Sequence, residues 1–327
     1  MSALVKENIQ LVACPRERPT CLKTSGVLDS IGCTPMLLIK GASEETGCRI
    51  YAKAEYLNPG GSVKDRIAHA IILAAEQRGD LKPDSTILEV TSGNTGIALS
   101  MVGAARGYKV VIVMPRSVSE ERRHMIRSVG AELHLIKALN DIHSAVKRTA
   151  ELASRDAHIF LPSQFSNPDN TKCHEMTTGP EIIRQMNGDV DAFVMGVGTG
   201  GTLMGVGRAF RNVGLSARNV AVEPDESAVM SGGPPGKHGI QGLADGFIPD
   251  LVDMEEIDSV VRIKTADAID MSRRLSAEEG LFVGISAGAN VLAAIRVARD
   301  LGPGHSIATV LPDRGERYLS MTGNAHG

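Results

Sequence analysis

Short apolar runs alternate along the chain with longer segments in which apolar residues recur every three to four positions. In the segment 66–79, Ile67, Ala70, Ile71 and Ala74 fall on one face of a helix, and Gly79 is a typical helix end. A five-residue run, Thr-Ile-Leu-Glu-Val at 86–90, follows and has the length and composition of a buried strand. Repeated alternation of this kind is typical of parallel sheets that are covered by helices.

The alternation of strands and helices extends to residue 311 in two series. The Gly/Pro-rich stretch 231–250 interrupts the second series before its last elements. It predicts strands at 86–90, 109–114, 132–136, 158–161, 191–196, 219–223, 258–264, 281–284 and 306–311. It predicts helices at 66–79, about 95–105, about 119–129, 142–155, 173–186, 202–211, 266–279 and 287–301. We therefore expect two α/β domains with a ligand cleft between them, while residues 1–24 lack sustained periodicity and are expected to form an N-terminal extension.

The charge balance of the 327 residues argues against a nucleic-acid or membrane partner. Lys and Arg number 35, Asp and Glu number 38, the formal charge is −3 and Trp is absent. The longest charge-free stretches have 16 residues, fewer than the roughly 20 that span a bilayer. Lys6 and Glu7 precede any long apolar run, which is unlike a signal peptide, so we expect a cytoplasmic protein.

Cysteine and histidine usage gives no sign of a metal site or a disulfide framework. The cysteines at 14, 21, 33, 48 and 173 are odd in number and contain no CxxC pair. The nine histidines are scattered along the chain. We therefore expect reduced thiols and no metal ion.

A glycine-rich loop, Gly196-Val197-Gly198-Thr199-Gly200-Gly201-Thr202, follows an apolar strand and opens a helix. Its glycines satisfy GxGxxG, and Glu223 lies at the end of the next strand, as in a dinucleotide-binding fingerprint. Backbone N–H groups at a helix start hold any phosphate, however, so another phosphorylated cofactor fits equally, and a plain packing turn remains the alternative.

A second motif, Gly284-Ile285-Ser286-Ala287-Gly288, matches the GxSxG turn of hydrolases. A hydrolase also needs an acid and a histidine downstream, and Asp300 with His305, or Asp313 with His326, fit that requirement poorly. A small-residue turn in which Ser286 caps a helix is the simpler interpretation.

Two further segments carry polar chemistry. Thr91-Ser92-Gly93-Asn94-Thr95-Gly96 places hydroxyls, an amide and free N–H groups at a helix start, which favours a carboxylate or phosphate ligand over an ordinary cap. Lys64 follows the glycine turn Asn58-Pro59-Gly60-Gly61 and precedes an apolar helix. Its amine is either a surface charge or a group positioned for Schiff-base formation.

Together these segments resemble the O-acetylserine sulfhydrylase (cysteine synthase) family of fold-type-II pyridoxal-phosphate enzymes, over nearly the whole chain. The resemblance rests on ordered matches at 32–35, 58–66, 91–96, 114–115, 119–123, 164–168, 174–181, 196–202, 231–233, 238–242, 284–289 and 315–320. It implies two three-layer α/β domains with mostly parallel sheets and the cofactor cleft between them, as in the tryptophan synthase β fold. Residues 25–56 plus 166–327 would form the larger, cofactor-binding domain, and residues 57–165 a smaller, mobile, substrate-binding domain.

The resemblance also implies a role for each motif. Lys64 would bind pyridoxal 5'-phosphate and act as base and acid, Asn94 would bond the ring hydroxyl, and Ser286 the pyridine nitrogen. The phosphate would lie on Gly198, Thr199, Gly200, Gly201 and Thr202. The substrate carboxylate would be held by Thr91, Ser92, Gly93, Thr95 and Gln164. On this interpretation neither a nucleotide nor a hydrolase nucleophile is required.

The implied reaction is a β-replacement in which O-acetyl-L-serine loses acetate to give an α-aminoacrylate, and sulfide adds to form L-cysteine. Cystathionine β-synthase, which uses homocysteine as the nucleophile, is the alternative. The family also implies a homodimer and docking of the C-terminal tail of serine acetyltransferase, so a purely regulatory binding role is a hypothesis of another class. The chain departs from the family's Gly-Ile-Gly-Ala-Gly-Phe at Ala244 and Asp245, which puts the preferred nucleophile and leaving group in doubt.

Overall fold

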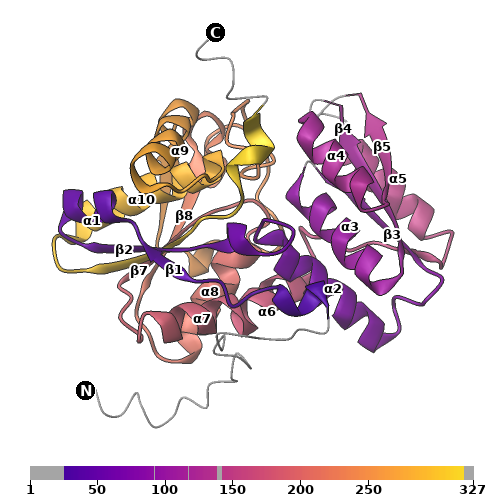
Figure 1. The fold of residues 1–327 in the computed structure, drawn as a ribbon, viewed down its shortest axis with the longest axis horizontal. Helices are drawn as coiled ribbons and strands as arrows, with labels where there is room; N and C mark the ends of the chain where they lie inside the picture. Colours follow the sequence, from indigo (N-terminus) through magenta and orange to yellow (C-terminus); the bar gives the residue numbers. More distant parts are fainter. Residues whose placement is uncertain (1–25, 92, 117, 138–141, 320–327) are drawn as a thin grey trace.

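The computed structural model describes residues 26–91, 93–116, 118–137 and 142–319, arranged around two separate sheets (Figure 1). The predicted extension 1–24 and Ser92 therefore lie outside the described residues. No helix in the described part of the chain is long and apolar enough to cross a membrane.

The larger sheet has six strands in the order β1-β2-β10-β7-β8-β9, all parallel except for the antiparallel pair β1 and β2. Its strands are β1 (Met36–Leu38), β2 (Arg49–Lys53), β7 (Ala192–Gly196), β8 (Arg218–Pro224), β9 (Ser259–Ile263) and β10 (Ser306–Val310). Strand β10, near the end of the chain, lies between β2 and β7, so the sheet joins segments from both halves of the sequence.

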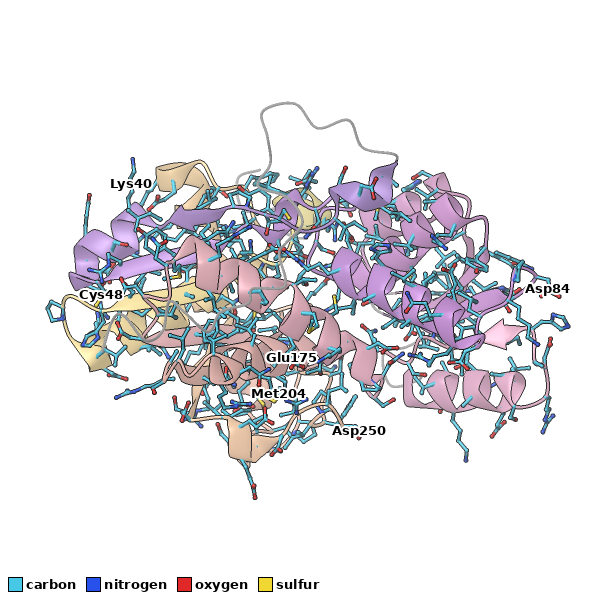
Figure 2. The ribbon with its side chains drawn as sticks, turned by 90° about the horizontal axis from the view of Figure 1, so that it is seen from below. Lys40, Cys48, Asp84, Glu175, Met204 and Asp250 are labelled. Atoms are coloured by element: carbon cyan, nitrogen blue, oxygen red, sulfur yellow. The ribbon has the colours of Figure 1, made fainter. Side chains whose placement is uncertain are left out.

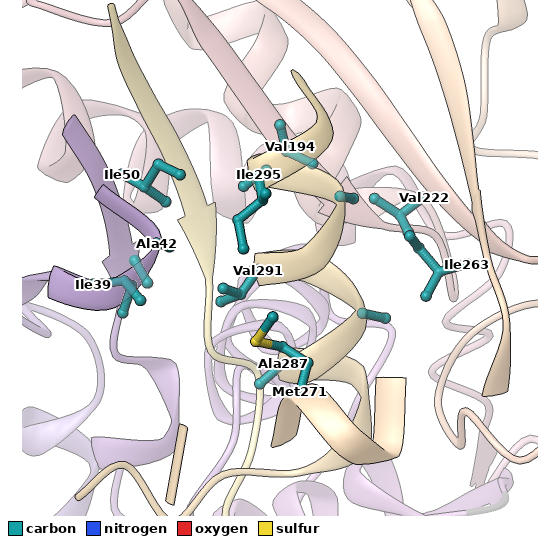
Figure 3. Close-up of a cluster of buried hydrophobic side chains, with 14 of the residues drawn as sticks. Ile39, Ala42, Ile50, Val194, Val222, Ile263, Met271, Ala287, Val291 and Ile295 are labelled. Carbon is teal, nitrogen blue, oxygen red and sulfur yellow. The ribbon is translucent and has the colours of Figure 1, made fainter. Parts of the chain in front are cut away.

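Helices cover both faces of this sheet. They are α1 (Lys40–Thr46), α6 (Pro168–Met176), α7 (Thr178–Gln185), α8 (Gly201–Asn212), α9 (Thr265–Glu279) and α10 (Ile285–Leu301). Alternate residues of β7 enter different cores: Val194 packs with α9 and α10, whereas Phe193 packs with α7 and α8. Figure 3 shows Val291 of α10 in the first of these cores. This two-sided burial produces three layers, and the central strand β7 accordingly consists of apolar residues and glycine, all buried.

The smaller sheet has four parallel strands in the order β5-β4-β3-β6. Its strands are β3 (Thr86–Val90), β4 (Lys109–Pro115), β5 (Glu132–Ile136) and β6 (Ile159–Phe160). The helices of this part are α2 (Lys64–Arg78), α3 (Asn94–Arg106), α4 (Glu120–Ser128) and α5 (Ile142–Ala153). Figure 2 shows the length of the molecule, with Cys48 of the larger part and Asp84 of the smaller part at opposite ends. The two-sheet α/β fold class predicted from the sequence is confirmed.

A buried cluster of charged side chains connects the two parts, and its residues are Lys53, Glu55, Arg66 and Glu181. Arg66 of α2 lies 2.7 Å from Glu55 and 2.8 Å from Glu181, which is also 2.7 Å from the Lys53 amine. Burial alone would raise the pKa of Glu181, but Arg66 and Lys53 lower it to about 2. The cluster is thus neutral as a whole and fixes α2 against the larger sheet.

Three sequence predictions are wrong in detail. Residues 281–284 form no strand, since Val283 makes only an isolated bridge with Arg314. The single helix predicted at 173–186 is two helices that meet at Thr177, whose ψ of −69° comes with an extended φ of −127°. Cys33 is disulfide-bonded, so the expectation that all cysteines are reduced holds only for Cys48 and Cys173 among the described residues.

Short 3₁₀ helices complete the connections, and the sequence pattern predicted none of them. They are η1 (Val27–Ser30), η2 (Glu55–Leu57), η4 (Asp225–Ser227), η5 (Met254–Glu256) and η6 (Gly315–Tyr318). η6 lies beside α4 of the smaller part, because the Ser119 hydroxyl donates to the Arg317 carbonyl, 3.2 Å away. The end of the described chain therefore contacts both parts of the molecule.

Candidate active site

A pocket between the two parts brings together nearly all of the residues that the sequence singled out. Its lining includes Lys64, Thr91, Gly93, Asn94, Thr95, Gln164, Gly198, Thr199, Gly200, Thr202 and Ser286. Gly201 starts α8 directly behind this lining, and Ser92 lies outside the described residues. Segments more than two hundred residues apart in sequence thus share one cavity.

Lys64 is the first residue of α2, and its half-buried side chain faces the pocket. Burial lowers the pKa of the Lys64 amine, and the nearby carboxylates Asp245 and Asp313 offset part of that effect. A lowered pKa increases the share of neutral amine at a given pH. The Lys64 amine is therefore suited to act as a nucleophile or a base.

The glycine-rich loop between β7 and α8 forms one wall of the pocket. Gly200 adopts a left-handed conformation with φ +84°, and Gly201 begins the helix. A Cβ at Gly198 would lie 2.3 Å from the Gly242 carbonyl oxygen, and one at Gly201 would lie 2.0 Å from Asn170 Oδ1. Positions 198 and 201 must therefore be glycine for the backbone to pass so close to its neighbours. A glycine-rich loop that leads into a helix N-terminus at a pocket forms a cradle suited to a phosphate.

His174 supports this cradle, and sequence reasoning assigned it no role. Its Nδ1 lies 2.8 Å from the Thr178 hydroxyl, and its Nε2 lies 3.2 Å from the Thr202 hydroxyl of the loop. Burial, with Arg66 nearby, lowers the pKa of His174 to about 3, so the ring is neutral. Nothing in the sequence marks this histidine except its place in the quoted segment 174–181.

The opposite wall is a cradle of neutral hydrogen-bonding groups. The Thr91 hydroxyl accepts from the Gly93 N–H at 3.2 Å, and the Thr95 hydroxyl donates to Gln164 Oε1 at 2.5 Å. The backbone carbonyl of Gln164 accepts from the Asn170 side-chain amide, which also donates to the Thr199 hydroxyl. The two walls are therefore tied together behind the pocket, and this wall has the hydroxyls and amides that suit a carboxylate ligand.

The comparisons with known proteins agree with this arrangement. A family model described as "Pyridoxal-phosphate dependent enzyme" matches residues 27–313. The chain belongs to that family. It is 48% identical to a cysteine synthase of Staphylococcus aureus over 291 residues, covering 89% of this chain and 94% of that protein.

Solved structures with the same fold have related activities. A cysteine synthase from Entamoeba histolytica has a TM-score of 0.89 and 40% identity, with 94% of this chain and 92% of that chain covered. An O-ureido-L-serine synthase has a TM-score of 0.88 and 44% identity, with 94% and 98% covered. An O-acetylserine-dependent cystathionine β-synthase from Helicobacter pylori has a TM-score of 0.86 and 36% identity, with 92% and 98% covered. The fold is thus that of the fold-type-II pyridoxal-phosphate-dependent enzymes, and pyridoxal phosphate is the cofactor.

The residues of this pyridoxal-phosphate-dependent enzyme fit their cofactor. A lysine faces a glycine loop built at backbone contact distance, and Ser286, at the start of α10, lines the same pocket. The Asn94 amide group donates to Asp313 Oδ2 at 2.7 Å and its carbonyl accepts from Arg317. These two contacts fix the orientation of the Asn94 side chain and leave its second N–H available for a ring oxygen.

The structure of this pyridoxal-phosphate-dependent enzyme accounts for the two motifs that resemble a dinucleotide-binding loop and a hydrolase turn. Glu223, the acid of the apparent dinucleotide fingerprint, accepts from Met230 N, Ser231 N and the Ser231 hydroxyl, so its oxygens hold a loop. His305, a candidate hydrolase partner for Ser286, lies 3.1 Å from Asp191 and is not among the pocket residues.

The family departure at Ala244 places a side chain where the backbone favours glycine. Ala244 has φ +46°, and its N–H donates to the Val197 carbonyl at 2.9 Å, next to the phosphate loop. Asp245 follows it and lines the pocket. The strained position thus lies next to Asp245, the only acidic residue among the described residues that line the pocket.

Replacing Gly198 with alanine is expected to weaken pyridoxal-phosphate binding by about tenfold or more, since overpacking typically costs about 1–3 kcal/mol. The new Cβ would meet the Gly242 carbonyl, which belongs to backbone and cannot rotate away. Titration of apoenzyme with the cofactor, followed by absorbance, measures the effect. Gly26→Ala is the control, since a Cβ there meets nothing within 4 Å, and equal affinities in the two variants would contradict the steric argument.

Glu89 is expected to make folding pH-dependent. It is buried on β3 and accepts from Ser163 N at 3.0 Å, and burial raises its pKa from 4.5 to about 8. The folded protein therefore retains a proton that the unfolded chain releases, and this contribution to stability is lost as pH rises from about 4.5 to about 8. Glu89→Gln should make the free energy of unfolding less dependent on pH across that range, whereas Glu151→Gln, at an exposed position, should not. Urea titrations at several pH values measure this dependence. The same pH dependence in wild type and in Glu89→Gln would refute the assignment.

Proposed function

We propose that this chain is a cysteine synthase that forms L-cysteine from O-acetyl-L-serine and sulfide by β-replacement. The observation that carries the proposal is that Lys64 shares one pocket with the glycine loop, suited to a phosphate, and with the Thr91–Gln164 cradle, suited to a carboxylate. The cysteine synthases among the relatives and solved structures support the same substrates.

The proposal assigns each pocket residue a role in the reaction. Bound pyridoxal phosphate withdraws electrons from the substrate Cα. The Lys64 amine anchors the cofactor, removes the proton from Cα and later returns it. Thr91, Ser92, Gly93, Thr95 and Gln164 hold the substrate carboxylate and so fix the direction of the Cα–H bond. Gly198 to Thr202 hold the phosphate, Ser286 bonds the pyridine nitrogen and Asn94 the ring oxygen.

The same proposal includes the domain division and the partners that the sequence suggested. Residues 57–165 would move as a unit against residues 25–56 and 166–327 and exclude water from the pocket. The chain would work in the cytoplasm as a homodimer and accept the C-terminal tail of serine acetyltransferase in its pocket. Sedimentation equilibrium tests the dimer, which requires twice the mass of one chain.

Visible absorption of the purified enzyme tests the reaction. We expect a yellow cofactor band that shifts to longer wavelength with O-acetyl-L-serine and returns with sulfide, releasing L-cysteine. A return with homocysteine but not with sulfide would instead identify a cystathionine synthase, as in the Helicobacter pylori neighbour. Absence of any band after incubation with pyridoxal phosphate would refute the proposal.

A further inference from the structure

Arg122 is a buried cation in the pocket; it lies within the matched segment 119–123, but the proposed reaction assigns it no role. It lies on α4, in the smaller part of the molecule, and only 3% of its surface is exposed. Its guanidinium donates to Gln241 Oε1 and lies 4.8 Å from the centre of the Tyr318 ring. Both neighbours belong to the larger part, so Arg122 reaches across the cleft.

The charge of Arg122 has no carboxylate partner within 4 Å among the described residues. Its Nε is buried and makes no hydrogen bond. A buried charge without an ion pair is costly, and proteins seldom retain one unless a ligand completes it. The guanidinium therefore indicates an anionic ligand.

The carboxylate cradle is the part of the pocket next to this guanidinium. A Cβ built on Gly93 would lie 3.2 Å from both Cζ and Nε of Arg122, so the guanidinium packs directly on Gly93. The cradle itself offers only neutral donors, as described above. Apart from Arg122, the only cation among the described residues that line the pocket is Lys64, which the proposed reaction assigns to the cofactor.

We propose that Arg122 binds substrate by supplying the positive charge that balances the carboxylate of the amino acid in the Thr91–Gln164 cradle. The inference rests on the proposed function, because that function puts an amino acid in the pocket. Charge-assisted contacts are stronger than neutral ones, so Arg122 selects α-amino acids over amines that lack a carboxylate.

The alternative to this proposal is that Arg122 has a purely structural role. Its contacts with Gln241 and the Tyr318 ring connect the two parts across the cleft. Loss of such a clamp would weaken the binding of every ligand by a similar factor. Loss of a countercharge would weaken only ligands that carry the carboxylate.

The experiment compares L-serine with ethanolamine, which is L-serine without its carboxylate. Their dissociation constants for the holoenzyme are measured from the change in the visible cofactor band, for wild type, Arg122→Met and Arg122→Lys. Arg123→Met is the matched control, since the neighbouring Arg123 guanidinium donates to the Arg116 and Val118 carbonyls and does not line the pocket. Retention of the cofactor band and the circular dichroism spectrum shows that each variant is folded.

We expect Arg122→Met to weaken L-serine binding by about 10- to 100-fold and ethanolamine binding by no more than about twofold. Arg122→Lys, which keeps the charge, should lose less, and Arg123→Met should match wild type for both ligands. Equal weakening of both ligands, or no change in either, would overturn the inference. If wild-type enzyme shows no cofactor band at all, the proposed function fails; if it shows the band and responds to L-serine, only the role of Arg122 is in question.

Discussion

Replacing Lys64 with alanine is expected to lower the turnover of O-acetyl-L-serine by at least about 10²- to 10⁴-fold, the usual contribution of proton transfer by a positioned side chain. The true loss is larger if the same amine also anchors the cofactor, because both functions disappear together. No other lysine lines the pocket, so the described residues offer no substitute amine. Initial rates of cysteine formation, with cofactor in excess, measure the effect.

The cofactor band separates the two roles of Lys64. Lys64→Ala should still bind pyridoxal phosphate through the loop after β7, but without the band of the lysine-bound form. Lys40→Ala, on the surface helix α1 and labelled in Figure 2, is the matched control and should keep both band and rate. Turnover of Lys64→Ala within tenfold of wild type would show that another group moves the proton.

Replacing Arg66 with methionine is expected to reduce the free energy of unfolding by about 3–5 kcal/mol. The variant would leave Glu55 and Glu181 buried with only Lys53 to balance them. Since α2 also carries Lys64 at its start, the loss of this cluster should loosen the cofactor lysine as well. Urea-induced unfolding, followed by circular dichroism, measures the change.

Arg106→Met provides the comparison for the buried cluster. Arg106 makes a short ion pair with Glu76, but its side chain is 36% exposed. Exposed pairs contribute about 0–1 kcal/mol, so this variant should unfold close to wild type. If Arg66→Met and Arg106→Met were destabilised equally, burial would not be what makes the Arg66 cluster important.

The sequence predicted those helices and strands whose pattern of apolar and polar residues lies within one short stretch of the chain. Strands such as 86–90 and 109–114 are continuous apolar runs between helices of clear periodicity, and both occur close to the predicted bounds. The strand β2, Arg-Ile-Tyr-Ala-Lys, was not predicted because its only aliphatic residues, Ile50 and Ala52, are flanked and separated by polar ones. Its burial depends on pairing with β10, far along the chain. The run 281–284 was predicted as a strand because it is apolar. In the structure Phe282 is 50% exposed, and among the described residues the run makes only the isolated bridge between Val283 and Arg314.

The candidate site could be predicted where a motif keeps its residues together. Each motif lies within a short stretch of sequence, and Lys64, Thr91, residues 93–95, residues 198–200 and Thr202 all line one pocket. His174 and Arg122 were missed for a physical reason. Each is a single polar residue on a helix rich in charged and polar neighbours, and its burial comes from partners distant in sequence, such as Thr202 for His174 and Tyr318 for Arg122.

The position of β10 between β2 and β7 has a consequence for biosynthesis. During translation β2 is complete once Lys53 has emerged, but its parallel neighbour β10 begins only at Ser306. The four strands of the smaller sheet all lie between these points, so they can pair while the ribosome is still adding the rest of the chain. Cofactor capture then comes last, since the pocket needs Ser286, Pro312 and the closed larger sheet. The sheet order thus requires synthesis to pass Pro312 before the cofactor can be bound in the complete pocket.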